Sequence, residues 1–481
     1  MDRARSSAIL IFLAACAVYW NSLDGEFVFD DTAIVKNLDP RLGGILGSHY
    51  WQSVAGSGGL YRPVVMLSYA LNHLLGELDP WGYHLVNVVI HAVNAVLVLL
   101  VIGELFGDRR FAFWSGLLFA LHPIRTEAVA YVVGRAESLA ALGFLAAWWC
   151  WLRGRVLAAA VFFLAAAWSK ESAFTFLAVP LLCDLVRARR PQWRSYLPLA
   201  AAAAAVALAV RWAVLGGLAP LSISAGANPI GTAPAATRLM TATAVFGQYL
   251  WLLVWPGPLS ADYSFNQIPP VTTPGSAGFL AGAAALVALV VATVWAWRRS
   301  KPLFFCGAFF LATFSLTSNF LRPIGTIMAE RLLYLPSLGF TCAVAWVLAR
   351  GGGRQAATVA GAALALVYGA RTVARSADWH DHVALFSSAA RVSPNSALVQ
   401  ANLANALLYQ RGDAAGAARH ALEAIRIEPG DPAAYMTLGD AYANLSDPAN
   451  AARAYARVEQ LAPGTAGAQE AARRRERLAG R

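Results

Sequence analysis

Two adjacent carboxylates, Asp30 and Asp31, lie in a long polar segment, roughly residues 22–80, between two hydrophobic stretches. Carboxylates just beyond such a stretch are costly unless they are solvated, paired or used in a reaction. Because neighbouring carboxylates repel, the pKa of one is raised, so one could act as a base while the other binds a cation or a donor. The alternative is a solvated loop with a turn at these two residues, and spacing alone leaves both readings open.

A second group of polar residues follows at positions 122–137. On a helix, Glu127, Tyr131 and Arg135 would be four residues apart and would share one face. A carboxylate, a phenol and a guanidinium on one face could hold a sugar phosphate, or they could form an internal ion pair. Snorkelling or mutual neutralisation would explain other outward charge pairs equally well. Two such pairs are Lys170-Glu171 and Glu330-Arg331.

The elements that must position these residues are hydrophobic. The chain of 481 residues is 58% hydrophobic and 14% charged, which excludes a single water-soluble domain, and its 16 Trp, 15 Tyr and 23 Phe exclude disorder. A bilayer crossing needs about 20 mostly apolar residues in a helix. We expect about 11 crossings, with the first stretch a retained signal anchor and 235–256 re-entrant or lying on the surface. The apolar stretches are 6–22, 83–106, 111–121, 138–152, 155–168, 172–186, 195–215, 235–256, 276–297, 302–319, 332–350 and 355–374.

The net charge of +11 belongs to the hydrophobic part, because residues 378–481 contain 11 Arg and 11 acids. Basic charge between apolar stretches is typical of membrane topology and not of nucleic-acid binding. The basic gaps are therefore predicted to be cytoplasmic, with a cytoplasmic N-terminus and, after an odd number of crossings, an extracytoplasmic C-terminal region. The five cysteines lack the spacing of a metal site or a disulfide framework. The basic clusters are Arg3/Arg5, Arg109/Arg110, Arg153/Arg155, Arg187/Arg189/Arg190/Arg194, Arg298/Arg299/Lys301 and Arg350/Arg354.

The C-terminal region contains a repeat. Pro394, Pro429 and Pro463 recur at separations of 35 and 34 residues, the period of a tetratricopeptide repeat (TPR). We predict an all-α chain with a membrane domain at 1–375 and a short TPR solenoid at 376–481. So few repeats need docking on the membrane domain or on a partner, and the run from Arg473 to Arg477 is interpreted as a solvated capping helix. The repeat positions matched in the last unit are Tyr435, Leu438, Gly439, Tyr442, Ala451 and Tyr455.

Motifs along nearly the whole chain resemble those of the transmembrane and tetratricopeptide-repeat protein O-mannosyltransferases, a family with the GT-C glycosyltransferase fold. The array here has barely three units, against many in the longer animal members, which leaves the acceptor open. The matching segments are Phe27 to Asp31, Tyr61 to Pro63, His84 to Asn87, His122 to Glu127, Gly134 to Glu137, Lys170-Glu171, Asn228 to Arg238, Trp255 to Pro269 and Ala329 to Pro336.

The resemblance implies an inverting transfer of a sugar, expected to be mannose, from a polyprenyl-phosphate donor on the extracytoplasmic face. Asp30 or Asp31 would deprotonate the acceptor hydroxyl, on Ser or Thr of a protein that the repeats engage directly or through a partner. Positive charge is needed at the leaving phosphate, and Arg binds phosphate oxygens bidentately. The candidates for binding donor or substrate are Arg62, His122, Arg125, Glu127, Arg135, Glu137, Lys170, Glu330 and Arg331.

Two other functions stay open from the sequence: a non-catalytic membrane scaffold that assembles partners on its repeats, and a lipid-linked-sugar transferase that acts on a glycan or a lipid. The sequence specifies no cofactor and no metal, although a divalent ion would be compatible with the expected chemistry. Arg outnumbers Lys by 35 to 3 and Ala is abundant, which suggests a GC-rich bacterial genome and a bacterial inner membrane. The sugar and the acceptor are not determined by the residues alone.

Overall fold

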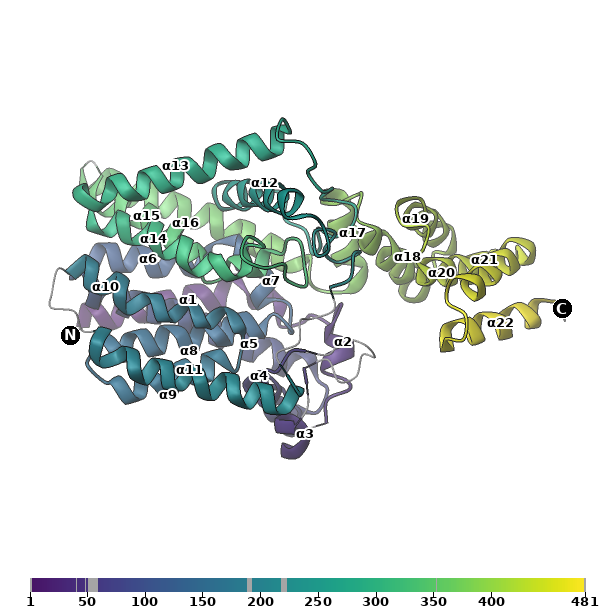
Figure 1. Ribbon diagram of the computed structural model, residues 1–481, viewed down its shortest axis with the longest axis horizontal. Helices are drawn as coiled ribbons and strands as arrows, with labels where there is room; N and C mark the ends of the chain where they lie inside the picture. Colours follow the sequence, from purple (N-terminus) through teal and green to yellow (C-terminus); the bar gives the residue numbers. More distant parts are fainter. Residues whose placement is uncertain are drawn as a thin grey trace.

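The computed structural model describes residues 2–39, 41–47, 49–50, 59–187, 193–217, 223–351 and 353–479. Every regular element in these ranges is helical, which confirms the predicted all-α class. A block of long helices carries the N-terminus at one end, and a smaller repeat domain projects from the opposite end (Figure 1).

Most of the long helices of the block follow the predicted apolar stretches to within about five residues, but the stretch 172–186 divides into the 3-10 segment η3 and the helix α10, which begins at Val179. Arg189 and Arg190, two of the predicted basic residues, lie outside the described residues. The long helices are α1 (Asp2–Val18), α5 (Pro80–Phe106), α6 (Arg109–Leu121), α8 (Arg135–Leu152), α9 (Val156–Ala167), α10 (Val179–Arg187), α11 (Trp193–Leu215), α12 (Ala235–Val254), α13 (Ala277–Arg299), α14 (Lys301–Phe314), α15 (Ser337–Arg350) and α16 (Arg354–Ala377). Shorter elements are η1 (Trp20–Ser22), α2 (Asp31–Ile34), α3 (Leu42–Gly47), α4 (Pro63–Gly76), η2 (Pro123–Arg125), α7 (Thr126–Val129), η3 (Glu171–Ala178), η4 (Ser315–Thr317) and η5 (Glu330–Leu333).

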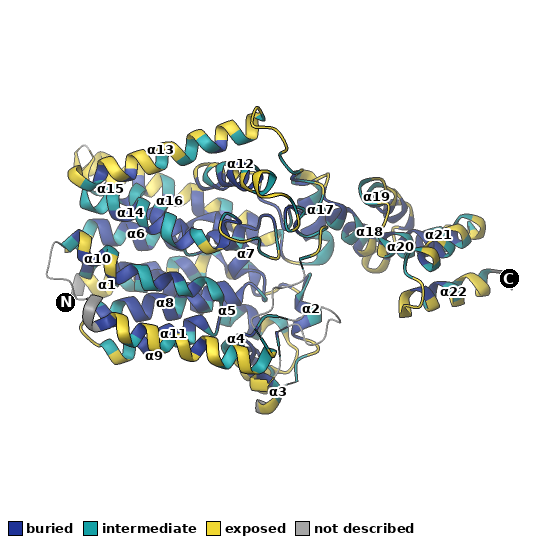
Figure 2. Cartoon of the chain, in the orientation of Figure 1, coloured by how far each residue is buried: buried dark blue, intermediate teal, exposed yellow. Residues whose placement is uncertain are grey.

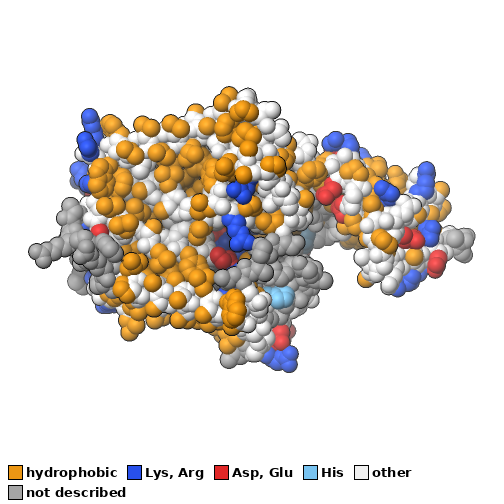
Figure 3. All heavy atoms as spheres, viewed as in Figure 1, with side chains coloured by type: hydrophobic (Ala, Val, Ile, Leu, Met, Phe, Trp, Pro, Cys, Tyr) orange, Lys and Arg blue, Asp and Glu red, His pale blue; other side chains and the backbone are white. Residues whose placement is uncertain are grey.

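Several of these helices suit a bilayer. Helices α11 and α13 bury only 11% of their most apolar window and present apolar side chains outward, whereas α5 is 61% buried at the centre of the block. Figure 3 shows the resulting hydrophobic surface over the block, with Lys and Arg at the end that carries the N-terminus. The chain is therefore a membrane protein. In the described part of the chain, the segments long and apolar enough to cross a bilayer on their own are Pro80–Phe106, Tyr196–Leu215, Ala277–Arg299 and Arg354–Ala377.

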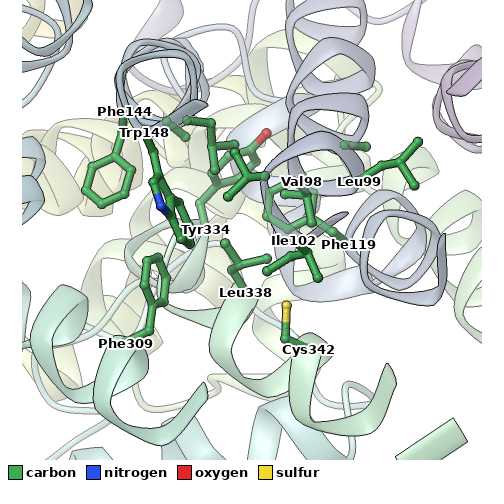
Figure 4. Close-up of a cluster of buried hydrophobic side chains, with 14 of the residues drawn as sticks. Val98, Leu99, Ile102, Phe119, Phe144, Trp148, Phe309, Tyr334, Leu338 and Cys342 are labelled. Atoms are coloured by element: carbon green, nitrogen blue, oxygen red, sulfur yellow. The ribbon is translucent and has the colours of Figure 1, made fainter. Parts of the chain in front are cut away.

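The core of the block is aromatic and aliphatic. The Trp148 indole of α8 stacks on Phe309 of α14 at 5.5 Å between ring centroids, and Phe119 of α6 meets Tyr334 edge-on at 5.6 Å. Figure 4 shows Leu338 of α15 between these two groups. Buried side chains gather in the middle of the block, while exposed ones line its outer helices (Figure 2). This packing gives the loops at the ends of the block a rigid base.

The loops at the N-terminal end of the block are joined by charged contacts. Arg153, after α8, lies 2.9 Å from a carboxylate oxygen of Glu104 in α5, and Arg187 of α10 donates to the carbonyl of the same Glu104 at 2.7 Å. Arg350, at the end of α15, lies 3.7 Å from Asp108. The basic gaps predicted to face one side of the membrane therefore do lie at one end of the block.

Helix α12 departs from the direction of its neighbours. It is strongly foreshortened in Figure 1, where α13 runs across the view. The two helices approach at glycines, since a Cβ on Gly247 would lie 2.8 Å from the Cα of Gly282. That residues 235–256 do not cross the membrane stays a prediction, and this arrangement agrees with it.

The repeat domain is a series of antiparallel helix pairs. Gly439 of α20 lies against the Tyr455 ring of α21, so closely that a Cβ would be 2.5 Å from a ring carbon. This contact explains why the repeat needs glycine at that position. The boundary predicted at 375/376 falls in the last turn of α16, which continues to Ala377. The repeat helices are α17 (His382–Val392), α18 (Ala397–Arg411), α19 (Ala414–Ile427), α20 (Pro432–Asn444), α21 (Pro448–Leu461) and α22 (Ala466–Ala479).

The first repeat helices dock on the end of the block. Phe386 and Leu385 of α17 share one buried cluster with Val28 and Tyr131 of the membrane domain. At the far end, Arg474 of α22 pairs with Asp440 of α20, so the basic run forms part of the last helix of the array. The docked end of the repeats and the long loops of the block therefore meet at one place.

Candidate functional site

Asp31 is a structural link between two loops. Its side chain is fully buried, one carboxylate oxygen accepts the Val28 N–H at 3.1 Å, and the other accepts the Val133 N–H at 2.8 Å. Burial raises the pKa of Asp31 well above its usual value, and the two backbone N–H groups oppose that rise. Because both oxygens are already occupied, Asp31 ties the first loop to the turn before α8 and has little to offer a substrate.

Asp30 has a different environment although it is the next residue. It keeps partial exposure, and its N–H donates to the Tyr131 hydroxyl at 3.1 Å. Burial raises the pKa of the Asp30 carboxyl, and Arg331 and the Tyr131 hydroxyl lower it. A partly exposed carboxylate with a raised pKa beside a cation is suited to accept a proton.

The residue before Asp30 is held in a strained conformation. Phe29 has φ 54°, in the left-handed region that is costly for an aromatic residue. Its ring stacks on Tyr131 at 6.1 Å and meets Phe386 of α17 edge-on at 5.8 Å. Its N–H donates to Nε2 of His382 at 3.2 Å. The repeat domain therefore helps to hold the backbone that presents Asp30.

Glu127 holds Arg331 in place. The Glu127 side chain is buried, one oxygen forms an ion pair with the Arg331 guanidinium, and the other accepts the Arg331 N–H at 2.7 Å. Arg331 keeps 27% of its side chain exposed, and its charge acts on both Asp30 and Tyr131. The two residues that the sequence places 204 positions apart thus form one unit, with Arg331 as its accessible end.

The prediction that Glu127, Tyr131 and Arg135 share one helical face is wrong. The helix α7 ends at Val129, and a turn precedes α8, which begins at Arg135. Gly134 makes the turn possible, because a Cβ there would lie 2.5 Å from the Glu127 carbonyl oxygen. The three residues therefore do not share one helical face.

Arg135 is occupied by the protein itself. Its guanidinium is fully buried and donates to the Asn87 side chain at 2.6 Å, to the Asn72 side chain at 2.7 Å and to the Tyr83 carbonyl at 2.8 Å. It also lies 4.8 Å from the centre of the Tyr69 ring. These contacts give Arg135 the role of joining α4 and α5 to the start of α8.

A second group of charges extends the site. Lys170 forms an ion pair with Glu137, while Arg62 and Arg211 lie 3.0 and 2.7 Å from the two oxygens of Glu171. Burial alone would raise the pKa of Glu171, but the two guanidinium groups lower it to about 2. The side chains of the three cations remain 12% to 19% exposed. With Arg331 they form a cationic array at the end of the block.

The side chains of His122 and Arg125 are occupied by contacts within the protein. His122 Nε2 is 3.0 Å from the Leu253 carbonyl, and its Nδ1 accepts the Ile124 N–H at 3.2 Å. Arg125 donates to the Phe119 carbonyl at 2.9 Å and lies over the Phe119 ring at 3.8 Å. Both side chains are fully buried. Their contacts join the loop after α6 to α12.

Glu330 faces the junction with the repeat domain. One oxygen accepts the Ser260 N–H at 2.5 Å and the Tyr263 hydroxyl at 2.8 Å, and the other lies 3.6 Å from Arg375 of α16. Burial raises the pKa of Glu330 to about 7, although Arg375 opposes that rise. Glu330 therefore points away from its neighbour Arg331, and the two residues do not act as a pair.

Two residues of the site escaped the sequence analysis. Arg211 lies in the apolar helix α11, and a lone charge in an apolar stretch is itself a signal of function. Asp262 acts on the pKa of Asp30, and its carboxylate accepts the Ser396 hydroxyl of the repeat domain at 2.8 Å. Nothing in the sequence near Asp262 indicates that contact. Within the described ranges, no group of three or more His, Cys, Asp or Glu could hold a metal ion.

The chain is similar to known proteins over most of its length. Residues 219–290 match the family described as Protein O-mannosyl-transferase TMTC, DUF1736. The mouse Protein O-mannosyl-transferase TMTC3 is 31% identical over 94% of the chain and 54% of its own length. The human Protein O-mannosyl-transferase TMTC1 is 30% identical over 90% of the chain and 56% of its own length. The chain spans about half the length of the curated relatives it matches, and by these similarities it belongs to the TMTC family.

Proposed function

We propose that the chain is a membrane glycosyltransferase that moves mannose from a polyprenyl-phosphate donor to a Ser or Thr hydroxyl of a protein. The observation that carries this proposal is that Asp30, a partly exposed carboxylate with a raised pKa, lies within electrostatic reach of Arg331, which Glu127 holds in place. The relatives' names, which describe protein O-mannosyltransferases, supply the sugar and the acceptor class.

In the proposed reaction, Asp30 takes the proton of the acceptor hydroxyl while the hydroxyl oxygen attacks the anomeric carbon of the donor. The bond from that carbon to the phosphate oxygen breaks, the configuration inverts, and the polyprenyl phosphate leaves with the bonding electrons. Negative charge grows on the phosphate, and preorganised guanidinium groups stabilise it. Arg331 is the cation whose charge acts on Asp30. Arg62, Lys170 and Arg211 provide further positive charge for the phosphate.

The position of the site suits a donor anchored in lipid. The cationic array lies where the apolar helices end, so the polyprenyl tail can stay in hydrocarbon while its phosphate meets the protein. We propose that the N-terminus is cytoplasmic and that the site and the repeats are extracytoplasmic, because the basic loops lie at the N-terminal end of the block. The mouse and human relatives are eukaryotic proteins, so they give no support to a bacterial membrane.

A scaffold without catalysis is the alternative function. A scaffold would need neither a strained residue before a half-buried carboxylate nor a buried Glu127 that holds Arg331 in place. Strain and buried charge are retained at sites that use them. These features favour the enzyme.

The test is transfer of mannose by the purified full-length protein from a synthetic polyprenyl-phosphate mannose to a Ser/Thr peptide, followed by mass spectrometry. Asp30→Asn should lower the rate at least about a hundredfold, since a general base contributes about 10²–10⁴. Asp24→Asn, an exposed carboxylate of the same loop, is the matched control and should keep the wild-type rate. Wild-type transfer by Asp30→Asn would contradict the assignment of the base. The orientation is tested with a reporter that is active only in the cytoplasm, fused after Arg481. Activity of this reporter would contradict an extracytoplasmic repeat domain.

A further inference from the structure

A cavity of about 630 Å³ lies between loops of the membrane domain and the repeat helices α17, α18 and α20. One wall contains Phe29 and Thr32 of the first loop, and the opposite wall contains Asn402 and Asn405 of α18. The turn between α19 and α20 closes one side with Glu428 and Asp431. Its volume is in the range of about 300–1,000 Å³ that is typical of ligand sites.

The cavity adjoins the proposed base. Phe29 and Thr32, which line it, immediately precede and follow the pair Asp30-Asp31 in the chain. A chain segment bound in the cavity would therefore contact the residues on either side of the pair Asp30-Asp31. The amide groups of Asn402 and Asn405 can each donate and accept, as binding to a polypeptide main chain requires.

The lining of the cavity contains acidic side chains and no Lys or Arg among the described residues. The acids are Glu428 and Asp431. His382 also lines the cavity, and burial lowers its pKa, which favours the uncharged ring. This composition contrasts with the cationic array that faces the donor.

The Glu428 carboxylate lies close to the loop at Gly226, which also lines the cavity. A Cβ on Gly226 would lie 3.6 Å from one of the carboxylate oxygens. Burial and the nearby Asp431 both raise the pKa of Glu428, as expected for two carboxylates without a neighbouring cation. Asp431 also accepts the Ala433 N–H at 2.9 Å and so begins α20. A cation placed between these two side chains would relieve their repulsion.

We propose that this cavity binds the acceptor polypeptide and selects segments that carry Lys or Arg close to the acceptor Ser or Thr. Glu428 and Asp431 recognise the basic side chain, while Asn402 and Asn405 hold the main chain. This inference rests on the proposed function for the identity of its ligand, and it adds the charge of the preferred acceptor.

Binding and transfer are measured separately on the full-length protein in detergent. The probes are fluorescein-labelled Ser/Thr peptides that differ only in two flanking positions, which are Lys, Gln or Glu. Fluorescence anisotropy should show that the Lys peptide binds about five- to tenfold more tightly than the Gln peptide and that added salt reduces this preference. The Glu peptide should bind most weakly.

The variant Glu428→Gln/Asp431→Asn should remove this preference without loss of folding, because Asn also caps helices. The matched control is Glu423→Gln, which lies on α19, pairs with Arg426 and does not line the cavity. Equal binding of the Lys and Gln peptides to the wild type, or an unchanged preference in the double variant, would overturn the inference. If transfer fails with every peptide while the binding preference persists, the proposed function fails and the cavity assignment stands.

Discussion

The two neighbouring carboxylates should respond in opposite ways to the same substitution. Asp31 accepts backbone N–H groups with both oxygens, whereas Asp30 accepts none of these and is partly exposed. We therefore expect Asp31→Asn to damage folding and Asp30→Asn to damage chemistry alone.

The magnitudes follow from the contacts. In Asp31→Asn, the new amide has one acceptor oxygen, so its NH₂ group must face either the Val28 or the Val133 N–H. The raised pKa of Asp31 favours an uncharged side chain, which acts against this loss. A buried donor that faces an N–H and has no acceptor costs about 1–3 kcal/mol, and we expect this cost to prevail, so that the variant unfolds at a lower temperature than the wild type.

Asp30→Asn should have the same or a higher unfolding temperature. Burial raises the pKa of Asp30 above its value in the unfolded chain, so its ionised form destabilises the fold at neutral pH. Its contribution to stability is present at acidic pH and is lost as the pH rises through the folded pKa. An uncharged Asn avoids that loss, while transfer falls about a hundredfold or more.

The assay follows thermal unfolding of both variants in one detergent by intrinsic fluorescence, together with mannosyl transfer per folded molecule. Asp24→Asn controls for removal of a charge from this loop. If Asp31→Asn unfolds like the wild type but is inactive, while Asp30→Asn retains full transfer, then the assignment of the two residues is reversed.

Three further predictions follow from the other contacts. Arg135→Lys should lower the unfolding temperature, at a cost of about 1–3 kcal/mol, because Lys cannot reach all the acceptors of the buried guanidinium, which belong to Asn87, Asn72, Tyr83 and Ser68. A lower unfolding temperature with unchanged transfer per folded molecule would confirm this prediction. Arg211→Met should raise KM for the polyprenyl-phosphate donor several-fold with little change in KM for the peptide, and equal changes in both would contradict a role at the phosphate. Glu330→Gln should match the wild type in unfolding temperature near about pH 5 and exceed it near about pH 8. The reason is that a folded pKa raised to about 7 removes stability from the wild type as the pH rises, and a constant difference across this range would refute that pKa.

The apolar stretches predicted the helices of the block well, because a bilayer crossing needs a long uninterrupted run of apolar residues. The repeat period likewise predicted the helix pairs beyond α16. The pairing of side chains could not be predicted. Asp30 and Asp31 have the same residue type and adjacent positions, and their difference depends on the Val133 N–H, 102 residues further along the chain.

The prediction for residues 127–135 failed for a local reason. Four-residue spacing indicates one face only if the helix is continuous, and here Gly134 allows a tight turn against the Glu127 carbonyl. The pairing of Glu127 with Arg331 and of Glu171 with Arg211 depends on which helices the block brings together. Spacing along the chain contains no information about these contacts.

The contacts between Phe29 and α17 restrict how an array of this kind can grow. His382 and Phe386 hold the strained backbone beside Asp30, so α17 cannot be displaced without disturbing that residue. Units inserted between α16 and α17 would separate the two halves of this contact, whereas units added beyond α21 would leave it intact. A longer array on the same block therefore has a direction: its proximal helices hold the backbone beside Asp30, whereas its distal end can vary in length without disturbing that contact.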